Sequence, residues 1–375
     1  MKDPFDIVIN RFDNRGYRES LGGVNPTGAS AIMKDEKGEE ILVGKCIRQV
    51  WYSKKKVPRT NPPTKRNKFL FLMGNAIEEY LQEMWEGAGI LLGGNIKLRQ
   101  NIASNPDKDE PIWLSGEVDA LLRDCEIEEG ADGKERVIID PYKAIGIEVK
   151  TTYGYHKKKS LMGAGNDLYR IGFPQIEHLM QTALYLHTRK VLENYYGVEI
   201  PYFVIVYMLR DSGETTSFRI ELEDGYDGRV IVKDIDGNEI KPNIEKTLEW
   251  GVDVRPIELT IDAIKKRFKQ QIENLKSDTP PAREFSLRYS EEDAKSNFEK
   301  GKMSKTAFKK WESNPLEAVG DWNCSYCDWK DVCYPQGIFT VDVENGILTI
   351  DEALEKYGIG QSVGWIKGEG NVEGN

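Results

Sequence analysis

The sequence predicts an α/β fold in which a mixed central sheet is flanked by helices. Two observations predict it. Strand-like runs alternate along the chain with segments whose apolar residues recur at helical spacing. In addition, the run 202–209 is almost continuously apolar, which is typical of a strand buried inside a sheet. The chain has 375 residues, enough for one large domain or two ordinary ones.

The elements of the first half of the chain follow from apolar periodicity and from clusters of turn residues. Residues 1–45 are polar and rich in Gly and Asn, so we expect them to be irregular as far as Ile41. After them we expect helices over 46–52 and 69–87, strands over 96–103, 112–122 and 145–151, and an acidic turn over 124–133.

The second half of the chain continues the alternation and ends in a charged region. We expect a helix over 176–187, a strand over 202–209, short strands within 215–250, helices over 260–275 and 291–311, a hairpin over 339–350, and disorder over 368–375. The hairpin is expected to turn at Asn345-Gly346, a pair that favours tight turns.

Composition restricts the function classes. Hydrophobic residues make up 39% and charged residues 30% of the chain, as in globular proteins. No apolar run approaches the roughly 20 residues of a membrane span, and the N-terminus lacks the pattern of a secretory signal, so we expect a cytoplasmic protein without membrane contact. The net charge of −10 argues against a protein that coats nucleic acid non-specifically.

Two strand-like runs carry the most informative side chains. Side chains alternate faces along a strand, so Glu148 and Lys150 should point one way while Ile147 and Val149 enter a core. Asp119 ends a similar run. If the strands are neighbours, two carboxylates suited to Mg²⁺ or Mn²⁺ lie beside an ammonium group that can orient water. This pattern favours metal-assisted phosphodiester hydrolysis, with an ordinary solvated strand face as the alternative.

Four of the five cysteines form a second pattern. Cys324, Cys327 and Cys333 are closely spaced, Cys46 lies far upstream, and Cys125 looks unrelated to them. A reducing compartment disfavours a disulfide, and structural zinc usually shows paired spacings. A 4Fe–4S cluster takes four thiolates and tolerates one distant ligand, so we favour it, with zinc and unliganded thiols as alternatives. Such a cluster would have a structural role, because it would join residue 46 to the 324–333 segment.

Together these motifs resemble the RecB-type branch of the PD-(D/E)XK nucleases. The chain is most similar to the iron–sulfur exonucleases of that branch, which include CRISPR-associated adaptation nucleases and AddB-type nuclease domains. The resemblance rests on the order of the motifs: Cys46-x-Arg48-x-x-Trp51, a helix with an early ligand, Asp119, Glu148-x-Lys150, Gln181-x-x-x-Tyr185, and the three late cysteines. It covers roughly 46–209 and 324–333.

The resemblance implies a restriction-endonuclease-like sheet with a C-terminal iron–sulfur cap. It also implies a DNA exonuclease that depends on Mg²⁺ or Mn²⁺. Asp119, Glu148 and the Val149 carbonyl would hold the metal, and Lys150 would orient or help to deprotonate the attacking water. A zinc-stabilised endonuclease and a non-catalytic DNA-binding or adaptor protein on the same fold are the alternatives.

The early metal ligand departs from the usual pattern of the iron–sulfur branch, which is Gly-x-x-x-His. This chain has Gly74 followed by Glu78, a form that looks more like phage exonucleases of the lambda type. A carboxylate can replace imidazole as a ligand of a hard cation. We therefore expect Glu78 to be catalytic and metal-binding, with Glu79 as the second choice and a surface glutamate as the alternative.

Residues for DNA contact also follow from the resemblance. Gln181 and Tyr185 share a helical face and would line the site and touch DNA, unless this is an ordinary amphipathic helix. The run Lys157, Lys158 and Lys159 follows the strand of Glu148, where a phosphate backbone would pass, although solvated lysines are the alternative. No helicase motif is present, so we expect a helicase or a recombination or adaptation protein as a partner, in a prokaryotic or phage-infected cytoplasm.

These features divide the chain into six expected parts. They are an irregular segment over 1–45, the PD-(D/E)XK nuclease core over 46–211, an appended β element over 212–255, a helical segment over 256–320, a cysteine segment over 321–335 that closes on Cys46, and a hairpin, short helix and flexible tail over 336–375.

Overall fold

The computed structural model describes most of the chain. The described residues are 22–34, 40–103, 109–129, 135–163, 172–223, 228–240, 259–301, 303–315, 317–334, 342–343 and 346–347. The chain divides into two compact units, each treated by itself below. The first comprises Met1–Val57 and Pro62–Glu284, and the second Pro58–Asn61 and Phe285–Asn375.

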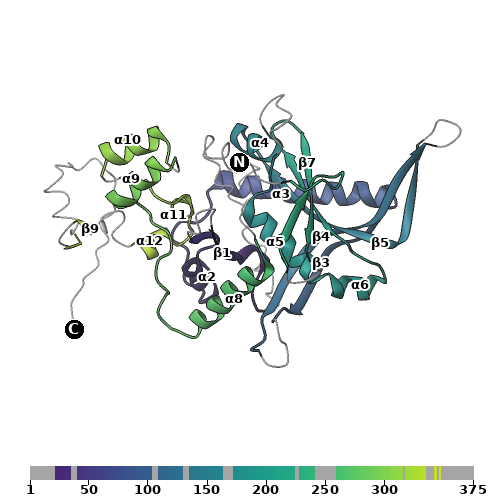
Figure 1. The fold of residues 1–375 in the computed structure, drawn as a ribbon, viewed down its shortest axis with the longest axis horizontal. Helices are drawn as coiled ribbons and strands as arrows, with labels where there is room; N and C mark the ends of the chain where they lie inside the picture. The colour runs from purple at the N-terminus through teal and green to yellow at the C-terminus, as the bar shows by residue number, and fades with distance from the viewer. Residues whose placement is uncertain are drawn as a thin grey trace, which may run out of the picture. The chain divides into compact units, whose positions relative to one another are not determined.

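A six-stranded mixed sheet is the centre of the first unit (Figure 1). Its strands, in spatial order, are β3 (Leu91–Asn101), β4 (Trp113–Glu129), β5 (Glu135–Thr152), β6 (Phe203–Leu209), β7 (Thr215–Leu222) and β8 (Val230–Lys233). Neighbouring strands are antiparallel except for β5 and β6, which are parallel. A parallel pair needs a long crossover connection, and α4 (Tyr155–Met162), α5 (Ile176–His187) and α6 (Arg189–Tyr196) supply it.

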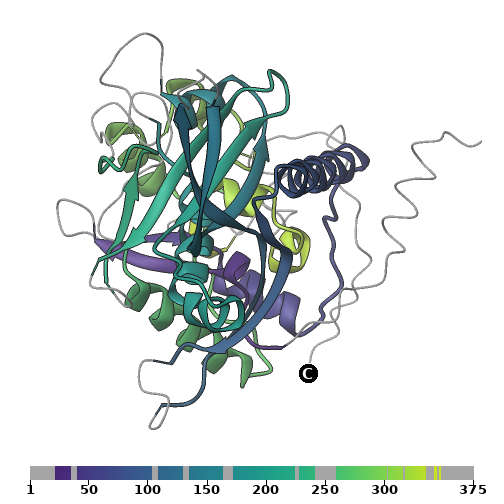
Figure 2. The same cartoon turned by 90° about the vertical axis from the view of Figure 1, so that its right-hand side faces the viewer.

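Helices cover both faces of this sheet, which confirms the predicted α/β class. Helix α5 packs against β6 and β7, while α3 (Lys65–Gly87) packs against β3, β4 and β5. Figure 2 shows α3 nearly end-on beside the sheet. Within the part of the chain that is described, no helix is both long and apolar enough to cross a membrane.

A further layer lies beyond α5. It contains η1 (Pro26–Gly28), the hairpin of β1 (Ser30–Lys34) and β2 (Glu40–Gly44), α2 (Ile47–Lys54) and α8 (Ile261–Leu275). Because α5 lies between this layer and the sheet, nearly all of its side chains are buried, as expected for a helix covered on every side.

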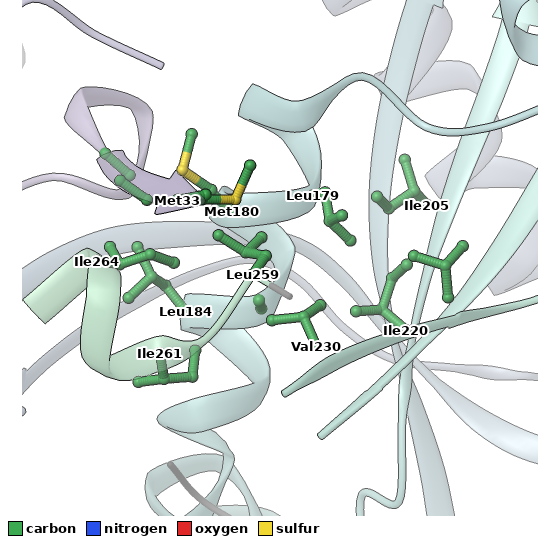
Figure 3. Close-up of a cluster of buried hydrophobic side chains, with 14 of the residues drawn as sticks. Met33, Leu179, Met180, Leu184, Ile205, Ile220, Val230, Leu259, Ile261 and Ile264 are labelled. Carbon is green, nitrogen blue, oxygen red and sulfur yellow. The ribbon is translucent and has the colours of Figure 1, made fainter. Parts of the chain in front are cut away.

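The largest hydrophobic core fills the space around α5 (Figure 3). Leu179 of α5 lies toward Ile205 and Ile220 of the sheet on one side, whereas Met180 and Leu184 lie toward the other side. On the other side the core contains residues of the hairpin and α8, among them Met33, Ile261 and Ile264. This packing fixes α5 relative to β5 and β6, and so fixes the side chains that α5 directs toward β5.

The opposite face of the sheet packs against α3. Ile147 and Val149 of β5 are buried there with Val204 of β6, and Leu81 and Trp85 of α3 pack against them. The predicted alternation along β5 is therefore confirmed, because Ile147 and Val149 face the core under α3 while Glu148 contacts α5.

The second unit is a small helical assembly. Its helices are α9 (Glu291–Glu299), α10 (Lys305–Ser313), α11 (Trp322–Ser325) and α12 (Lys330–Cys333). Tyr334 is buried against Leu287, and its hydroxyl donates to the Phe285 carbonyl at 2.7 Å. Asp321 accepts from the Ser286 N–H at 2.7 Å, which joins the start of the unit to its cysteine-bearing helices.

Three predictions about elements are wrong. The N-terminal segment 1–45 is not irregular throughout, because β1 and β2 form a hairpin within it. The segment 212–255 is not an appended β element in its described part, because β7 and β8 extend the central sheet. The acidic segment after residue 123 is not a turn as far as residue 129, because β4 continues through it and pairs with β5.

The remaining expected elements are present, but the strands expected over 112–122 and 145–151 are longer in the structure, since β4 continues to Glu129 and β5 begins at Glu135, and one helix is split. The expected helix over 291–311 is two helices, α9 and α10, with Gly301 between them at a φ of 70°. Strands β9 (Asp342–Val343) and β10 (Gly346–Ile347) pair as the expected hairpin. The predicted disordered tail over 368–375 lies outside the described residues.

Candidate functional site

Asp119 and Glu148 lie on neighbouring strands. In the β4–β5 pairing Ala120 lies opposite Ile147, and Asp119 directly precedes Ala120 while Glu148 directly follows Ile147. Beyond that pair the Asp119 carboxylate itself accepts the Val149 N–H, at 2.7 Å from Oδ2. Gln82 of α3 donates to the Asp119 carbonyl at 2.8 Å. Both the backbone and the side chain of Asp119 are therefore fixed, and its carboxylate is held against β5.

Glu148 is fully buried between β5 and α5. Its Oε1 accepts hydrogen bonds from Lys150 Nζ and, at 2.7 Å, from Gln181 Nε2. Its Oε2 has no hydrogen-bond partner within the described residues. A buried carboxylate oxygen without a partner is costly unless a proton or a cation is bound there.

Burial and neighbouring charges shift the pKa values of Glu148, Asp119 and Lys150. Burial raises the pKa of Glu148 to about 8, and the carboxylates of Asp119 and Glu78 add to the shift while Lys150 opposes it. Burial also raises the pKa of Asp119, against the opposing effect of Lys150. Burial alone would lower the pKa of Lys150, but Glu148 and Asp119 outweigh it, so this pKa is raised. The site therefore holds a charged ammonium beside carboxyl groups that bind protons unusually well.

Glu78 approaches this site from α3. It is half-buried, acts electrostatically on Glu148 and Lys150, and lies one turn after Gly74. A Cβ at Gly74 would lie 3.2 Å from Thr151 Oγ1, so the glycine lets α3 approach the end of β5 closely. Glu79 is exposed, whereas Glu78 is half-buried.

Gln181 and Tyr185 support Glu148 from α5. Gln181 Nε2 donates to Glu148 and also lies 3.3 Å from the Tyr185 hydroxyl. A Cβ at Gly116 would lie 2.7 Å from Tyr185 Cε1, so glycine at this position of β4 makes room for the ring. Tyr185 is only 2% exposed. The observed contacts of both residues position Glu148, and their contact with DNA stays a prediction.

The three consecutive lysines have different surroundings. Lys158 forms an ion pair with Glu214 at 2.5 Å, and Lys159 lies over the Tyr155 ring, 4.6 Å from its centroid. Partial burial lowers the pKa of the Lys157 ammonium group, although Glu177 opposes the shift. Of the three, only Lys157 acts on the histidine at the start of α5, His178.

Sequence reasoning assigned no role to the side chains that orient α5. His178 Nδ1 lies 2.9 Å from the hydroxyl of Tyr207, which also accepts the Gln175 N–H at 3.0 Å. His178 lies one turn before Gln181 on the same helical face, but this position alone does not assign it a role. Tyr207 carries a hydroxyl group in the otherwise apolar strand β6. Buried hydroxyl groups usually have a hydrogen-bond partner, so the sequence contains a weak indication of this contact.

The cysteines are divided between the two units. Cys46 precedes α2 in the first unit, where its carbonyl accepts the Val50 N–H. Cys324, Cys327 and Cys333 belong to the second unit, where Cys324 and Cys333 pack against Leu287 and Tyr334. The iron–sulfur cluster itself remains a prediction.

The carboxylates of the site are suitable ligands for the expected divalent metal. Asp119 and Glu148 offer carboxylate oxygens, including the unpartnered Glu148 Oε2, and these suit a hard cation. Among the described residues, no three His, Cys, Asp or Glu side chains are already arranged around one point. The donor chemistry fits Mg²⁺ or Mn²⁺, with Asp119 and Glu148 as the residues that would hold it.

Comparisons with known proteins add little to this description. No protein-family model matches the chain, and no curated protein matches it. A solved structure described as "Crystal structure of SSO0001" is similar over 60% of this chain and 80% of its own, at 14% identity and a TM-score of 0.34. A similarity at this level carries no argument about function.

Proposed function

We propose that the protein is a metal-dependent nuclease that hydrolyses phosphodiester bonds of DNA. The observation that carries the proposal is the state of Glu148. One oxygen of this buried carboxylate is held by Lys150 and Gln181, the other has no partner among the described residues, and Asp119 lies on the neighbouring strand. Structural ion pairs normally satisfy both oxygens of a buried carboxylate, so this arrangement favours a functional site.

Each side chain has a role that its contacts support. Asp119 and Glu148 would hold Mg²⁺ or Mn²⁺ with the Val149 carbonyl, and Glu78 would add a third carboxylate. A divalent ion bound there supplies Lewis-acid stabilisation of the charge that develops on the phosphoryl oxygens. Gln181 keeps Glu148 in place through a hydrogen bond to Oε1.

The raised pKa of Lys150 helps to decide its role. A group that stays protonated at neutral pH is a poor general base but a good hydrogen-bond donor. We therefore assign Lys150 to orienting the attacking water and stabilising negative charge in the transition state, in preference to removing the proton.

The resemblance supports an exonuclease that carries a structural 4Fe–4S cluster on Cys46, Cys324, Cys327 and Cys333. It also supports a partner protein that unwinds or delivers DNA. These finer features belong to the proposal and rest on motif order.

The proposal is tested by incubating purified protein with linear DNA and with covalently closed circular DNA, in Mg²⁺ or Mn²⁺ and in EDTA. We expect linear DNA to be degraded only with a divalent ion, and circular DNA to persist. Cleavage of both substrates would favour the endonuclease alternative. Binding without cleavage under every metal condition would favour the non-catalytic alternative.

A further inference from the structure

Residues from four elements of the first unit contact His178 or act on it electrostatically near the start of α5. Tyr207 of β6 fixes the imidazole of His178, and the Gln175 N–H fixes Tyr207 in turn. Lys150 of β5, Lys157 of α4 and Lys45, which follows β2, act electrostatically on that imidazole. The nuclease proposal uses Lys150, but it gives no role to Lys45 or His178.

His178 is a neutral hydrogen-bond donor in this setting. Burial lowers the pKa of His178 well below its ordinary value, and Lys150, Lys157 and Lys45 lower it further. Because the Tyr207 hydroxyl accepts from Gln175, its own proton is available to His178 Nδ1. Donation to Nδ1 places the imidazole proton on Nε2, which can then donate to a ligand.

The backbone holds Lys45 at this position. Gly44 packs so closely against α5 that a Cβ there would lie 2.5 Å from Met180 Cε and 2.5 Å from the Ala29 carbonyl oxygen. The Lys45 N–H donates to the same carbonyl at 3.0 Å. The end of β2 is therefore fixed beside α5, and Lys45 is half-buried there.

Positive charge at this position is incompletely neutralised. Within the described ranges, neither Lys45 nor Lys157 forms an ion pair at 4 Å or less, whereas the adjacent Lys158 pairs with Glu214. Glu177 attracts Lys157 from a greater distance. Clustered ammonium groups repel one another, and a bound anion would remove that cost.

We propose that Lys45, Lys157 and His178 form a phosphate-binding subsite that takes a nucleic-acid phosphate other than the one that is cleaved. Two ammonium groups and a neutral N–H donor suit a phosphate, which accepts charge-assisted hydrogen bonds on several oxygens. The α5 N-terminus adds a favourable partial positive charge. The subsite rests on the proposed function, since its neighbour Lys150 belongs to the proposed catalytic site.

The test measures binding of short duplex DNA in EDTA, so that affinity is read without cleavage. The variants are Lys45→Gln, Lys157→Gln and their combination, with Lys190→Gln as the control, an exposed lysine of α6 that pairs with Glu193. We expect each single variant to weaken binding several-fold. The double variant should lower the slope of log affinity against log salt by about 1, the value for one lost phosphate contact. Lys190→Gln should bind like the wild type.

A second set of binding measurements identifies which phosphate of the DNA is bound. The same proteins are measured with duplexes that carry a 5′-phosphate, a 3′-phosphate or only hydroxyl ends. A wild-type preference for one phosphorylated end that is lost in the double variant supports a terminal phosphate. Equal affinity for all ends, with the reduced salt slope, supports an internal phosphodiester.

The subsite and the nuclease proposal can fail separately. A folded double variant with wild-type affinity and salt slope would overturn the subsite, even if the wild type cleaves DNA. A wild type that binds DNA with the expected variant effects but never cleaves it would support the subsite and overturn the nuclease proposal.

Discussion

At the residue scale, the candidate site depends on how each acidic side chain is held. Asp119 is fixed by a backbone N–H, Glu148 by Lys150 and Gln181, and Glu78 by the position of α3. Strand periodicity alone predicted that Glu148 and Lys150 share a face. It could not predict the hydrogen bond between Gln181 and Glu148, because that contact requires the packing of α5 on the sheet.

The adjacent glutamates of α3 provide a matched pair of variants. Replacing Glu78 with Gln should lower the apparent affinity for Mn²⁺ in the cleavage assay by about 10- to 100-fold, as expected for loss of a ligand or its supporting group. Glu79→Gln should stay within about twofold of wild type, because Glu79 is exposed. Metal titrations of the cleavage rate check this, and the opposite ranking would assign the role to Glu79.

The buried Glu148 should make stability depend on pH. Its pKa is about 8 in the folded protein, against an ordinary value of 4.5, so the folded state binds this proton more tightly than the unfolded state. The resulting stabilisation is full below about pH 4.5 and is lost as the pH rises through about 8. In EDTA, the free energy of unfolding should therefore fall between about pH 4.5 and about pH 8.

Glu148→Gln separates this effect from that of Asp119, whose raised pKa acts in the same direction. Glutamine resembles the protonated carboxyl group, so the variant should lose part of the pH dependence. Urea unfolding at several pH values measures it, with Glu79→Gln as the control. Identical pH profiles for Glu148→Gln and the wild type would show that Glu148 titrates normally.

At the scale of elements, the long helices were predictable because their signal is local. The bounds of α5 agree with the predicted helix over 176–187, since its apolar residues recur along a single segment. The addition of β7 and β8 to the central sheet was not predictable, because strand pairing depends on contacts between distant segments. The hairpin of β1 and β2 was not predicted because its two strands are short and the sequence around them is rich in Gly and Asn, which is typical of irregular segments.

The contact between β4 and α5 depends on a glycine. Gly116→Ala places a methyl group 2.7 Å from the Tyr185 ring, so it should destabilise the protein by about 1–3 kcal/mol through overpacking. In a Tyr185→Leu background the same substitution should cost less, because the ring is gone. Urea unfolding of the four proteins gives the coupling energy.

Gly87→Ala is the control for this cycle, since no atom lies within 4 Å of a Cβ there. It should change stability by less than about 1 kcal/mol. Gly116→Ala is compared in proteins that carry Tyr or Leu at position 185. An equal loss in the free energy of unfolding in both would contradict the packing described for β4 and α5.

At the scale of the whole molecule, the sequence predicted the α/β class and the order of the motifs. The two-unit division places Cys46 in one unit and the other three cysteines of the motif in the other. That division depends on contacts along the entire chain, so no local sequence pattern predicts it. The cluster assignment therefore still rests on cysteine spacing.

Metal analysis tests the cysteines directly. Anaerobically purified protein should be brown and contain about four iron and four sulfide per chain, as a 4Fe–4S cluster requires. Cys327→Ser should bleach the protein and lower its unfolding temperature, because metal binding contributes to folding free energy. Cys125→Ser is the matched control and should retain iron. A colourless protein that contains zinc and is equally active would replace the cluster with a structural zinc site.

The most direct test of the catalytic proposal compares Asp119→Ala and Lys150→Ala with the wild type on linear DNA in Mn²⁺. Both variants should keep a cooperative unfolding transition and lose cleavage by at least about 100-fold, because each removes a group that acts on the reacting phosphate. The EDTA control should show no cleavage by any of the three proteins. Full activity in either folded variant would contradict the assignment of this site.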